Sequence, residues 1–210
     1  QVAAIETADL TGLSTAQVEA LTANQVKSLT TAQIEKLSTA QFAAITPDDL
    51  KSMTSGQINA LTTSQVSTMT TAQVAALGKT EVAGLSTAQV RALKTTQVSA
   101  INTTALATMT TDQLAGFDAT QVAKLTTDQT KALSASQVSS LSSSQINALT
   151  TTQVGALTAT QVKALTSSQF NAMGTTQLAA LTTTQVVGIE ATDVASLTSA
   201  QVNALTTSQL

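Results

Sequence analysis

Residues Ile45–Met53 read ITPDDLKSM and contain Pro47, the only proline in the 210-residue chain. The two ends of this stretch are apolar and lie eight residues apart. The same spacing continues in both directions, because every residue met at steps of eight from Ile5 to Leu205 is apolar. The chain is therefore an octapeptide repeat, and we number each octad from position one, the apolar residue, to position eight.

Three further octad positions are nearly constant. Of the 26 octads, 19 have Ser or Thr at position two and 21 have Gln at position five. Position six is apolar in every octad except that of Thr130. Ser or Thr followed three residues later by Gln is a capping box, in which each side chain bonds the other residue's backbone N–H at a helix start. Positions one and six, the residue before the cap and the fourth helical residue, match the apolar pair that packs together at such a helix start, the hydrophobic staple. Each octad thus predicts a short helix over positions three to eight.

Pro47 and the placement of charges support this frame. Pro47 follows the cap residue Thr46, in the first helical position, where a missing N–H costs nothing. Ten of the 12 acidic residues occupy positions two, four or five, and seven of the nine basic residues occupy positions seven or eight. The helix dipole favours acids at a helix start and bases at its end. A strand gives no reason for this order, and one continuous helix would rotate its apolar stripe by about 80° per octad.

The octads must stack to be stable, because an isolated helix needs about 12–15 residues to be even marginally stable in water. We predict an all-α solenoid of very short helices, one per octad, that runs uninterrupted over residues 1–210 as one domain. About three to four octads should complete one turn, and at four per turn the rod is roughly 60 Å long. We place positions one, six and eight in the core and positions three, four and seven in solvent. We also expect the chain to be a segment of a longer repetitive protein.

The composition indicates no catalytic chemistry. The chain has no Cys, His, Trp or Tyr, so the usual bases, nucleophiles and soft metal ligands are missing. We expect no enzyme activity, no catalytic residue, no cofactor and no metal site. A net charge of −3 with 10% charged residues gives no reason to expect a nucleic-acid partner. No apolar run approaches the roughly 18 residues that span a bilayer, so we expect no membrane insertion.

Several residues could be read as sites, but the octad frame explains them. Asp48 and Asp49 could form a carboxylate pair, yet adjacent helical residues diverge, and both lie in a first turn where acids cap. Three aromatic residues occupy the core positions one or six; they are Phe42, Phe117 and Phe170.

Two of the octads that depart from the consensus contain further candidate residues. Asn102-Thr103-Thr104 is a glycosylation sequon, and Asn102 also stands where the helix cap belongs. The same octad has Ala105 in place of Gln, so we expect a weaker capping box. Thr130 is the single polar residue at position six, and we expect a local defect or bend there.

Two resemblances to known families follow from these motifs. Leu181–Ile189, LTTTQVVGI, resembles the first helix of transcription activator-like effector repeats, which start with a similar L-T-x-x-Q-V-x-A-I. Those repeats have a 34-residue period and DNA-contacting residues that match no position here, so the resemblance implies no DNA binding. The whole chain is more similar to Thr/Gln-rich octad tracts such as LTTAQVAAL in long bacterial secreted or surface proteins of the adhesion or haem-utilisation type. That resemblance implies an extracellular stalk or fibre, while the absence of His, Tyr and Cys gives no support for a haem role.

We therefore expect a structural, non-enzymatic rod, stalk or filament segment that is secreted or displayed on a bacterial cell surface. Such a segment should associate with itself end to end or into filaments. The alternative is a repetitive binding surface, in which rows of exposed Thr and Ser at positions three and four contact polysaccharide, ice or another fibre.

Overall fold

The computed structural model describes residues 6–206 and 209, and this part of the chain contains 25 short α-helices and no strand. The helices are α1 (Thr7–Leu10), α2 (Thr15–Glu19), α3 (Ala23–Ser28), α4 (Thr31–Lys36), α5 (Thr39–Ala43), α6 (Pro47–Leu50), α7 (Ser55–Asn59), α8 (Thr63–Thr68), α9 (Thr71–Ala76), α10 (Lys79–Ala83), α11 (Thr87–Ala92), α12 (Thr95–Val98), α13 (Thr103–Leu106), α14 (Thr111–Ala115), α15 (Ala119–Val122), α16 (Thr127–Ala132), α17 (Ala135–Ser139), α18 (Ser143–Ala148), α19 (Thr151–Ala156), α20 (Ala159–Lys163), α21 (Ser167–Ala172), α22 (Thr175–Ala179), α23 (Thr183–Val186), α24 (Ala191–Ala195) and α25 (Ser199–Ala204).

Each of these helices begins at octad position three, as the capping box predicts, and ends at position six, seven or eight. In α9, the Thr70 hydroxyl accepts the backbone N–H of Gln73 at 3.1 Å, and Gln73 Oε1 accepts the backbone N–H of Thr70 at 2.8 Å. Pro47 is the first residue of α6, after the cap Thr46, so its predicted place is confirmed. The prediction of one short helix per octad is confirmed for this part of the chain.

Two extended residues, at positions one and two, precede each new helix. Where a helix ends before position eight, right-handed turn residues come first, as Lys51 does after α6 with φ −60° and ψ −19°. Leu29 ends α3 with φ −61° and ψ 137°, and Thr30 precedes α4 with φ −73° and ψ 159°. Across residues 6–206 and 209, no backbone φ is positive. The chain therefore changes direction between helices in conformations open to any residue, which is why the octad needs no conserved glycine.

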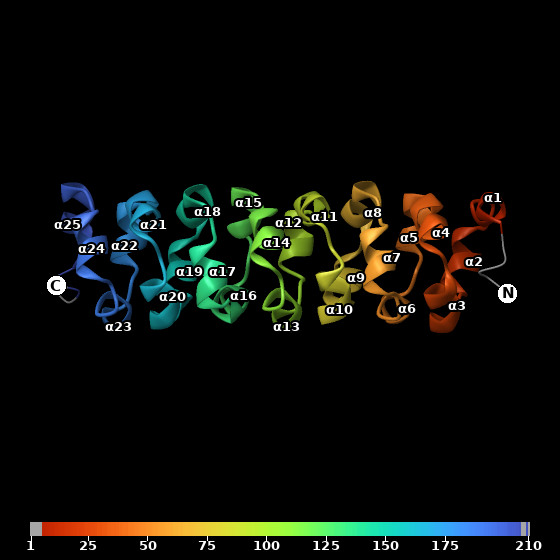
Figure 1. Cartoon of the computed structure of the whole chain (residues 1–210), viewed down its shortest axis with the longest axis horizontal. Coiled ribbons are helices and arrows are strands. Elements are labelled where there is room, and N and C mark those ends of the chain that lie inside the picture. Colours follow the sequence, from red (N-terminus) through yellow and green to blue (C-terminus); the bar gives the residue numbers. More distant parts are fainter. Residues whose placement is uncertain (1–5, 207–208, 210) are drawn as a thin grey trace. The chain divides into compact units, whose positions relative to one another are not determined.

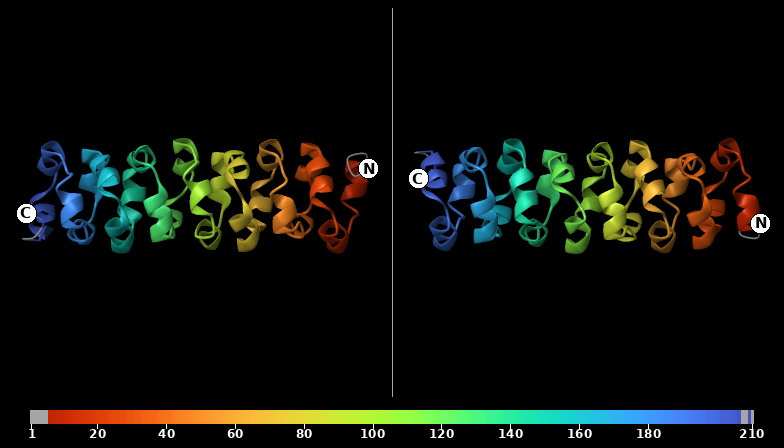
Figure 2. Two further views of the ribbon diagram at one scale, coloured as in Figure 1. Left: turned by 90° about the horizontal axis from the view of Figure 1, so that it is seen from below. Right: turned by 90° about the horizontal axis from the view of Figure 1, so that it is seen from above.

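The chain divides into two compact units, Gln1–Met109 and Thr110–Leu210. Within the first unit, each helix packs on the third helix after it, from α1 on α4 to α10 on α13 (Figure 1, Figure 2). Within the second unit the same rule holds from α14 on α17 to α22 on α25. The predicted turn of three to four octads is confirmed inside each unit. The continuity of one solenoid over residues 1–210 stays a prediction.

Positions one and six form the core of each unit, as predicted. Ile58 and Val138, at position six, are fully buried, and Leu77, at position one, is 1% exposed. Position four is exposed in every octad from Ala16 to Ala200, and positions three and seven are exposed or half-buried.

The prediction that position eight belongs to the core is wrong. Most alanines at this position are half-buried, because position eight lies where two turns touch rather than on the axis. At Gly84 a Cβ atom would come within 2.5 Å of the backbone oxygen of Ser55, on the helix three octads earlier. Small residues at position eight therefore let turns approach closely, as expected, but they do so at the rim.

Candidate functional site

The buried polar side chains of the molecule are mainly the glutamines at octad position five. Gln57 is 3% exposed, and its Oε1 accepts the backbone N–H of Thr54 at 2.8 Å, which completes the cap of α7. Its Nε2 donates to the carbonyl oxygens of Val26 at 3.0 Å and Leu29 at 2.7 Å, in the preceding turn. A buried amide needs partners at both ends, and this geometry supplies them from two different helices.

The same arrangement recurs through both units. In each case Nε2 donates to the carbonyls 31 and 28 residues earlier, at positions six and one. A helix ends there, and its last carbonyls lack partners within the helix. We call this set of bonds the amide ladder. Its members are Gln41, Gln57, Gln65, Gln73, Gln89 and Gln97 in the first unit and Gln145, Gln153, Gln161, Gln169, Gln177, Gln185, Gln201 and Gln209 in the second.

The capping box predicted only half of this role. A capping box accepts Glu as well as Gln at its third helical position, and the helix dipole favours Glu there. The sequence nevertheless has Gln in 21 octads, and only Gln has N–H groups to donate elsewhere. That preference was the available signal for a second partner, although it did not say where the partner lies.

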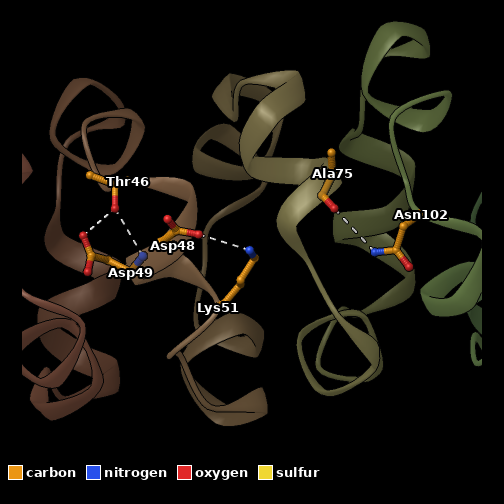
Figure 3. A network of polar contacts seen from close by, with 6 residues as sticks. All are labelled: Thr46, Asp48, Asp49, Lys51, Ala75 and Asn102. Carbon is orange, nitrogen blue, oxygen red and sulfur yellow. Dashed lines mark hydrogen bonds and ion pairs between the residues drawn. The ribbon is translucent and has the colours of Figure 1, made fainter.

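Two of the octads with Asp at position five bond to the preceding turn in another way. Asp49 only caps its own helix: its backbone N–H donates to Thr46 Oγ1 at 3.2 Å, and Thr46 Oγ1 donates to its carboxylate at 2.5 Å (Figure 3). The inter-turn bond comes instead from Ser52 at position eight, whose hydroxyl donates to the Ala23 carbonyl at 2.8 Å.

The octad of Asp193 repeats this solution. The hydroxyl of Ser196, again at position eight, lies 2.6 Å from the Asp193 carbonyl of its own helix and 3.3 Å from the Ser167 carbonyl of the preceding turn. Ser167 Oγ donates to Asp193 Oδ1 at 2.7 Å. In both octads a serine therefore replaces part of what the glutamine amide does elsewhere.

Asn102 combines cap and inter-turn donor in a single side chain. Its Oδ1 accepts the backbone N–H of Ala105 at 2.8 Å, as a cap does. Its Nδ2 donates to the carbonyl of Leu77. It also donates, at 3.5 Å, to the carbonyl of Ala75, the contact drawn in Figure 3. By the spacing of the amide ladder, the Leu77 carbonyl is the acceptor that a Gln at position 105 would use. The predicted structural explanation of the sequon residue, a helix cap, is confirmed, and the cap lacks its reciprocal bond as expected.

The other candidate residues do not converge on a site. Asp48 forms an exposed ion pair with Lys51 at 3.1 Å, while Asp49 faces its own cap, so the two carboxylates do not act together (Figure 3). The three phenylalanines, Phe42, Phe117 and Phe170, are at most 3% exposed and fill the core, as predicted.

Thr130 does not interrupt α16, so the local defect expected there is wrong, while the expected bend stays a prediction. The residue is fully buried, and its hydroxyl donates to the carbonyl of Thr126 at 2.9 Å, one turn earlier in α16. This bond satisfies the hydroxyl within its own helix, and α16 keeps six residues. A threonine thus fits a core position because it brings no polar group that needs an outside partner.

One exposed face of the second unit has paired hydroxyl residues on neighbouring helices. Helices α16, α19, α22 and α25 pack in series and carry, at positions three and four, Thr127, Asp128, Thr151, Thr152, Thr175, Thr176, Ser199 and Ala200. We call these eight exposed residues, six of which carry a hydroxyl group, the hydroxyl face. The corresponding series α2, α5, α8 and α11 in the first unit has Ala16, Ala40 and Ala88 at three of its four fourth positions.

Open hollows on the surface offer little chemistry. One, of about 470 Å³, is lined by residues of the first unit that include Glu19, Ala43, Pro47 and Ala72, and Glu19 is its one titratable side chain. Within residues 6–206 and 209, no three His, Cys, Asp or Glu side chains are grouped so that they could hold a metal ion. None of the described helices is both long and apolar enough to span a membrane.

The sequence matches one family model over residues 2–39, 42–79, 122–159 and 155–183, more than half of the chain. The chain belongs to the ALTTAQ repeat family. The letters of that name correspond to octad position eight followed by positions one to five, as in Ala148–Gln153, ALTTTQ. They therefore include the position-one residue, the cap and the ladder glutamine. No curated protein matches the chain.

Proposed function

We propose that this ALTTAQ repeat chain is a structural, non-enzymatic spacer, a stiff rod, stalk or filament segment that is secreted or held at a bacterial cell surface. The observation that carries the proposal is the amide ladder, which repeats one inter-turn joint through both units. In repeat proteins, stability is approximately the sum of unit terms and neighbour interfaces. Because the same inter-turn hydrogen bonds recur along the chain, a long segment gains stability from each turn.

The surface chemistry supports the same role. Charged residues make up 10% of the chain, and the net charge is −3. Repulsion between exposed charges, which salt screens beyond about 8–10 Å, therefore contributes little to the shape. A spacer of this kind keeps its length when the surrounding salt concentration changes.

Small-angle X-ray scattering tests the spacer. We expect an elongated particle whose maximum dimension is the same at about 0.05 M and about 1 M salt. Replacing five ladder residues by Ala should broaden the distance distribution and lower the unfolding temperature; these are Gln57, Gln65, Gln73, Gln89 and Gln97. The control replaces five exposed hydroxyl residues of the same unit by Ala and should change neither quantity; these are Thr63, Ser64, Thr80, Thr96 and Thr104. A compact particle, or equal effects of both sets, would contradict the proposal.

We further propose that such segments associate end to end. Val194, a position-six residue of α24, is 40% exposed, whereas Val162 at the same octad position is fully buried. Another turn of octads would cover this apolar side chain. Light scattering should show a mass that rises with concentration, and Val194→Lys should reduce the rise.

The second candidate is a binding surface, and the hydroxyl face favours it. Its threonines are exposed in pairs on α19 and α22, helices that lie side by side. Retention on immobilised polysaccharide or on ice should fall with the pair Thr152→Lys and Thr176→Lys. The control pair, Thr80→Lys and Thr96→Lys, makes the same change at position four of the first unit. Equal losses would indicate a general charge effect and count against this function.

A further inference from the structure

Within one unit, each octad is attached to the neighbouring turns of the coil. Each helix packs on the third helix after it. A ladder glutamine donates to the carbonyls 31 and 28 residues earlier, as Gln153 does with Val122 at 2.9 Å and Leu125 at 2.7 Å. An octad in the middle of a unit is therefore held by the turn before it and by the turn after it, whereas an octad at the edge of a coil has one such neighbour.

Each attachment is small, and its parts recur from turn to turn. Positions one and six each bring one buried apolar side chain, such as Leu149 and Val154. The amide adds two hydrogen bonds, which Gln161 repeats with the carbonyls of Thr130 at 3.0 Å and Leu133 at 2.6 Å. Because the described attachments have the same parts, no single one of them holds a whole unit together.

The attachment is kept where the amide is lost. After the octad of Asp9, position five is not Gln in four octads. In each of them another polar side chain joins the octad to the preceding turn. These bonds run from Ser52 to the Ala23 carbonyl at 2.8 Å, from Asn59 to the Gly84 carbonyl at 3.2 Å, from Asn102 to the Leu77 carbonyl and from Asn171 to the Ser196 carbonyl at 2.8 Å.

A force applied to the two ends of the chain loads such attachments one after another. An octad at the edge of a coil can leave by breaking its bonds to one turn, whereas an inner octad must break its bonds to two. The helix of a released octad has four to six residues and is not stable alone, so the octad becomes extended. Eight extended residues span about 26–29 Å, whereas a whole turn of three octads rises by about 8–10 Å, the distance between packed helices.

We propose that each unit is an extensible element that releases its octads one at a time under tension and takes them up again when the tension falls. Its length stays constant up to a threshold force and then grows at a nearly constant force. Recoiling requires contacts only about one turn away in sequence, so the loop that must close is short. The inference goes beyond the proposed spacer function, which concerns the chain without load, and either can fail without the other.

The test stretches the full chain between handles attached to its two ends in optical tweezers. We expect a plateau of many small steps, each of roughly 25 Å for one released octad, and a relaxation trace that follows the stretching trace. One or two abrupt events, each opening a whole unit, would overturn the proposal, because a unit would then unfold as one cooperative body. A chain that does not shorten again between cycles would also overturn it. A compact particle in the scattering experiment together with this plateau would contradict the spacer alone.

Two asparagines at position seven give a matched pair of variants. Asn59 Nδ2 donates to the Gly84 carbonyl at 3.2 Å, in an octad without a ladder glutamine. Asn147 Nδ2 donates to the Ala172 carbonyl at 2.7 Å, in an octad that Gln169 also attaches to the preceding turn. Asn59→Ala should merge two steps of the plateau into one of roughly twice the length, because the weakened attachment opens as soon as the load reaches it. The control Asn147→Ala should keep the wild-type steps, and equal step patterns in the two variants would contradict the proposal.

Discussion

Two octads of the first unit reach the preceding turn with an amide, but they carry it on different residues. Before α9, Thr70 caps the helix, and Gln73 both completes the cap and donates to the Ile45 carbonyl at 2.8 Å. Before α13, Asn102 caps the helix and donates to the Leu77 carbonyl, while position five holds the fully buried Ala105. The comparison teaches that the fold requires a donor at the end of the previous helix, and that more than one octad position can supply it.

The largest effect should come from Gln73→Ala. The change removes the bonds to the Thr70 N–H and to the Ile45 carbonyl. Ile45 is buried, so its carbonyl loses this partner away from water, whereas Thr70 is exposed. A hydrogen bond makes a net contribution of about 1 kcal/mol to the free energy of unfolding. A buried polar group that is left without a partner lowers it by about 1–3 kcal/mol more. We expect a loss of about 3 kcal/mol in the free energy of unfolding, measured by urea denaturation followed by circular dichroism.

Asn102→Ala should lower the free energy of unfolding by about 2 kcal/mol, somewhat less than Gln73→Ala. The reason is that the cap of α13 lacks the reciprocal side-chain bond that the cap of α9 has. Asn102→Asp separates its two roles, since a carboxylate still accepts the Ala105 N–H but cannot donate to Leu77. About half of the loss should remain in the Asp variant, again measured by urea denaturation. A loss below about 0.3 kcal/mol for Asn102→Asp would show that the inter-turn bond contributes little.

Thr70→Ala should cost about 1 kcal/mol, the ordinary value of a helix cap. The hydroxyl bonds the Gln73 N–H within the same octad, and the ladder bonds of Gln73 remain. Hydrogen exchange should therefore increase at the start of α9 more than at the end of α5. Equal increases at both places would mean that cap and ladder are one cooperative unit.

The smallest effect is expected for the double change Asn102→Thr with Ala105→Gln, which gives α13 the arrangement of α9. The new glutamine should reach the Val74 and Leu77 carbonyls, so the free energy of unfolding should stay within about 0.5 kcal/mol of the parent. Each single change serves as a control. A double variant whose free energy of unfolding is no higher than that of Asn102→Thr alone would contradict the exchange of roles between the two positions.

The local parts of the fold were predictable because their partners are close in sequence. Thr70 and Gln73 lie within one helix start, and Pro47 is compatible with one helical position, so helix starts follow from spacing alone. The donor role of Gln73 was not predictable in the same way, since its acceptor is 28 residues away and only the coil brings them together. Position eight was misplaced for a related reason: an Ala in a core and an Ala at a rim look alike in sequence. The defect expected at Thr130 was wrong because its hydroxyl finds a partner in Thr126, the cap residue of its own helix.

The amide ladder also gives each unit a direction. Every bond runs from an amide to a carbonyl at an earlier turn, as from Gln177 to Leu149. For the ladder bonds, a boundary drawn between two turns has unused donors on its later side and unused acceptors on its earlier side. Some asparagines outside the ladder run the other way, as Asn147 does when its Nδ2 donates to the Ala172 carbonyl of the next turn at 2.7 Å. Two identical boundaries cannot complete each other's bonds, whereas unlike ones can. A polymer assembled through such contacts would be polar. One of its ends would present ladder donors to the next segment, and the other would present carbonyl acceptors.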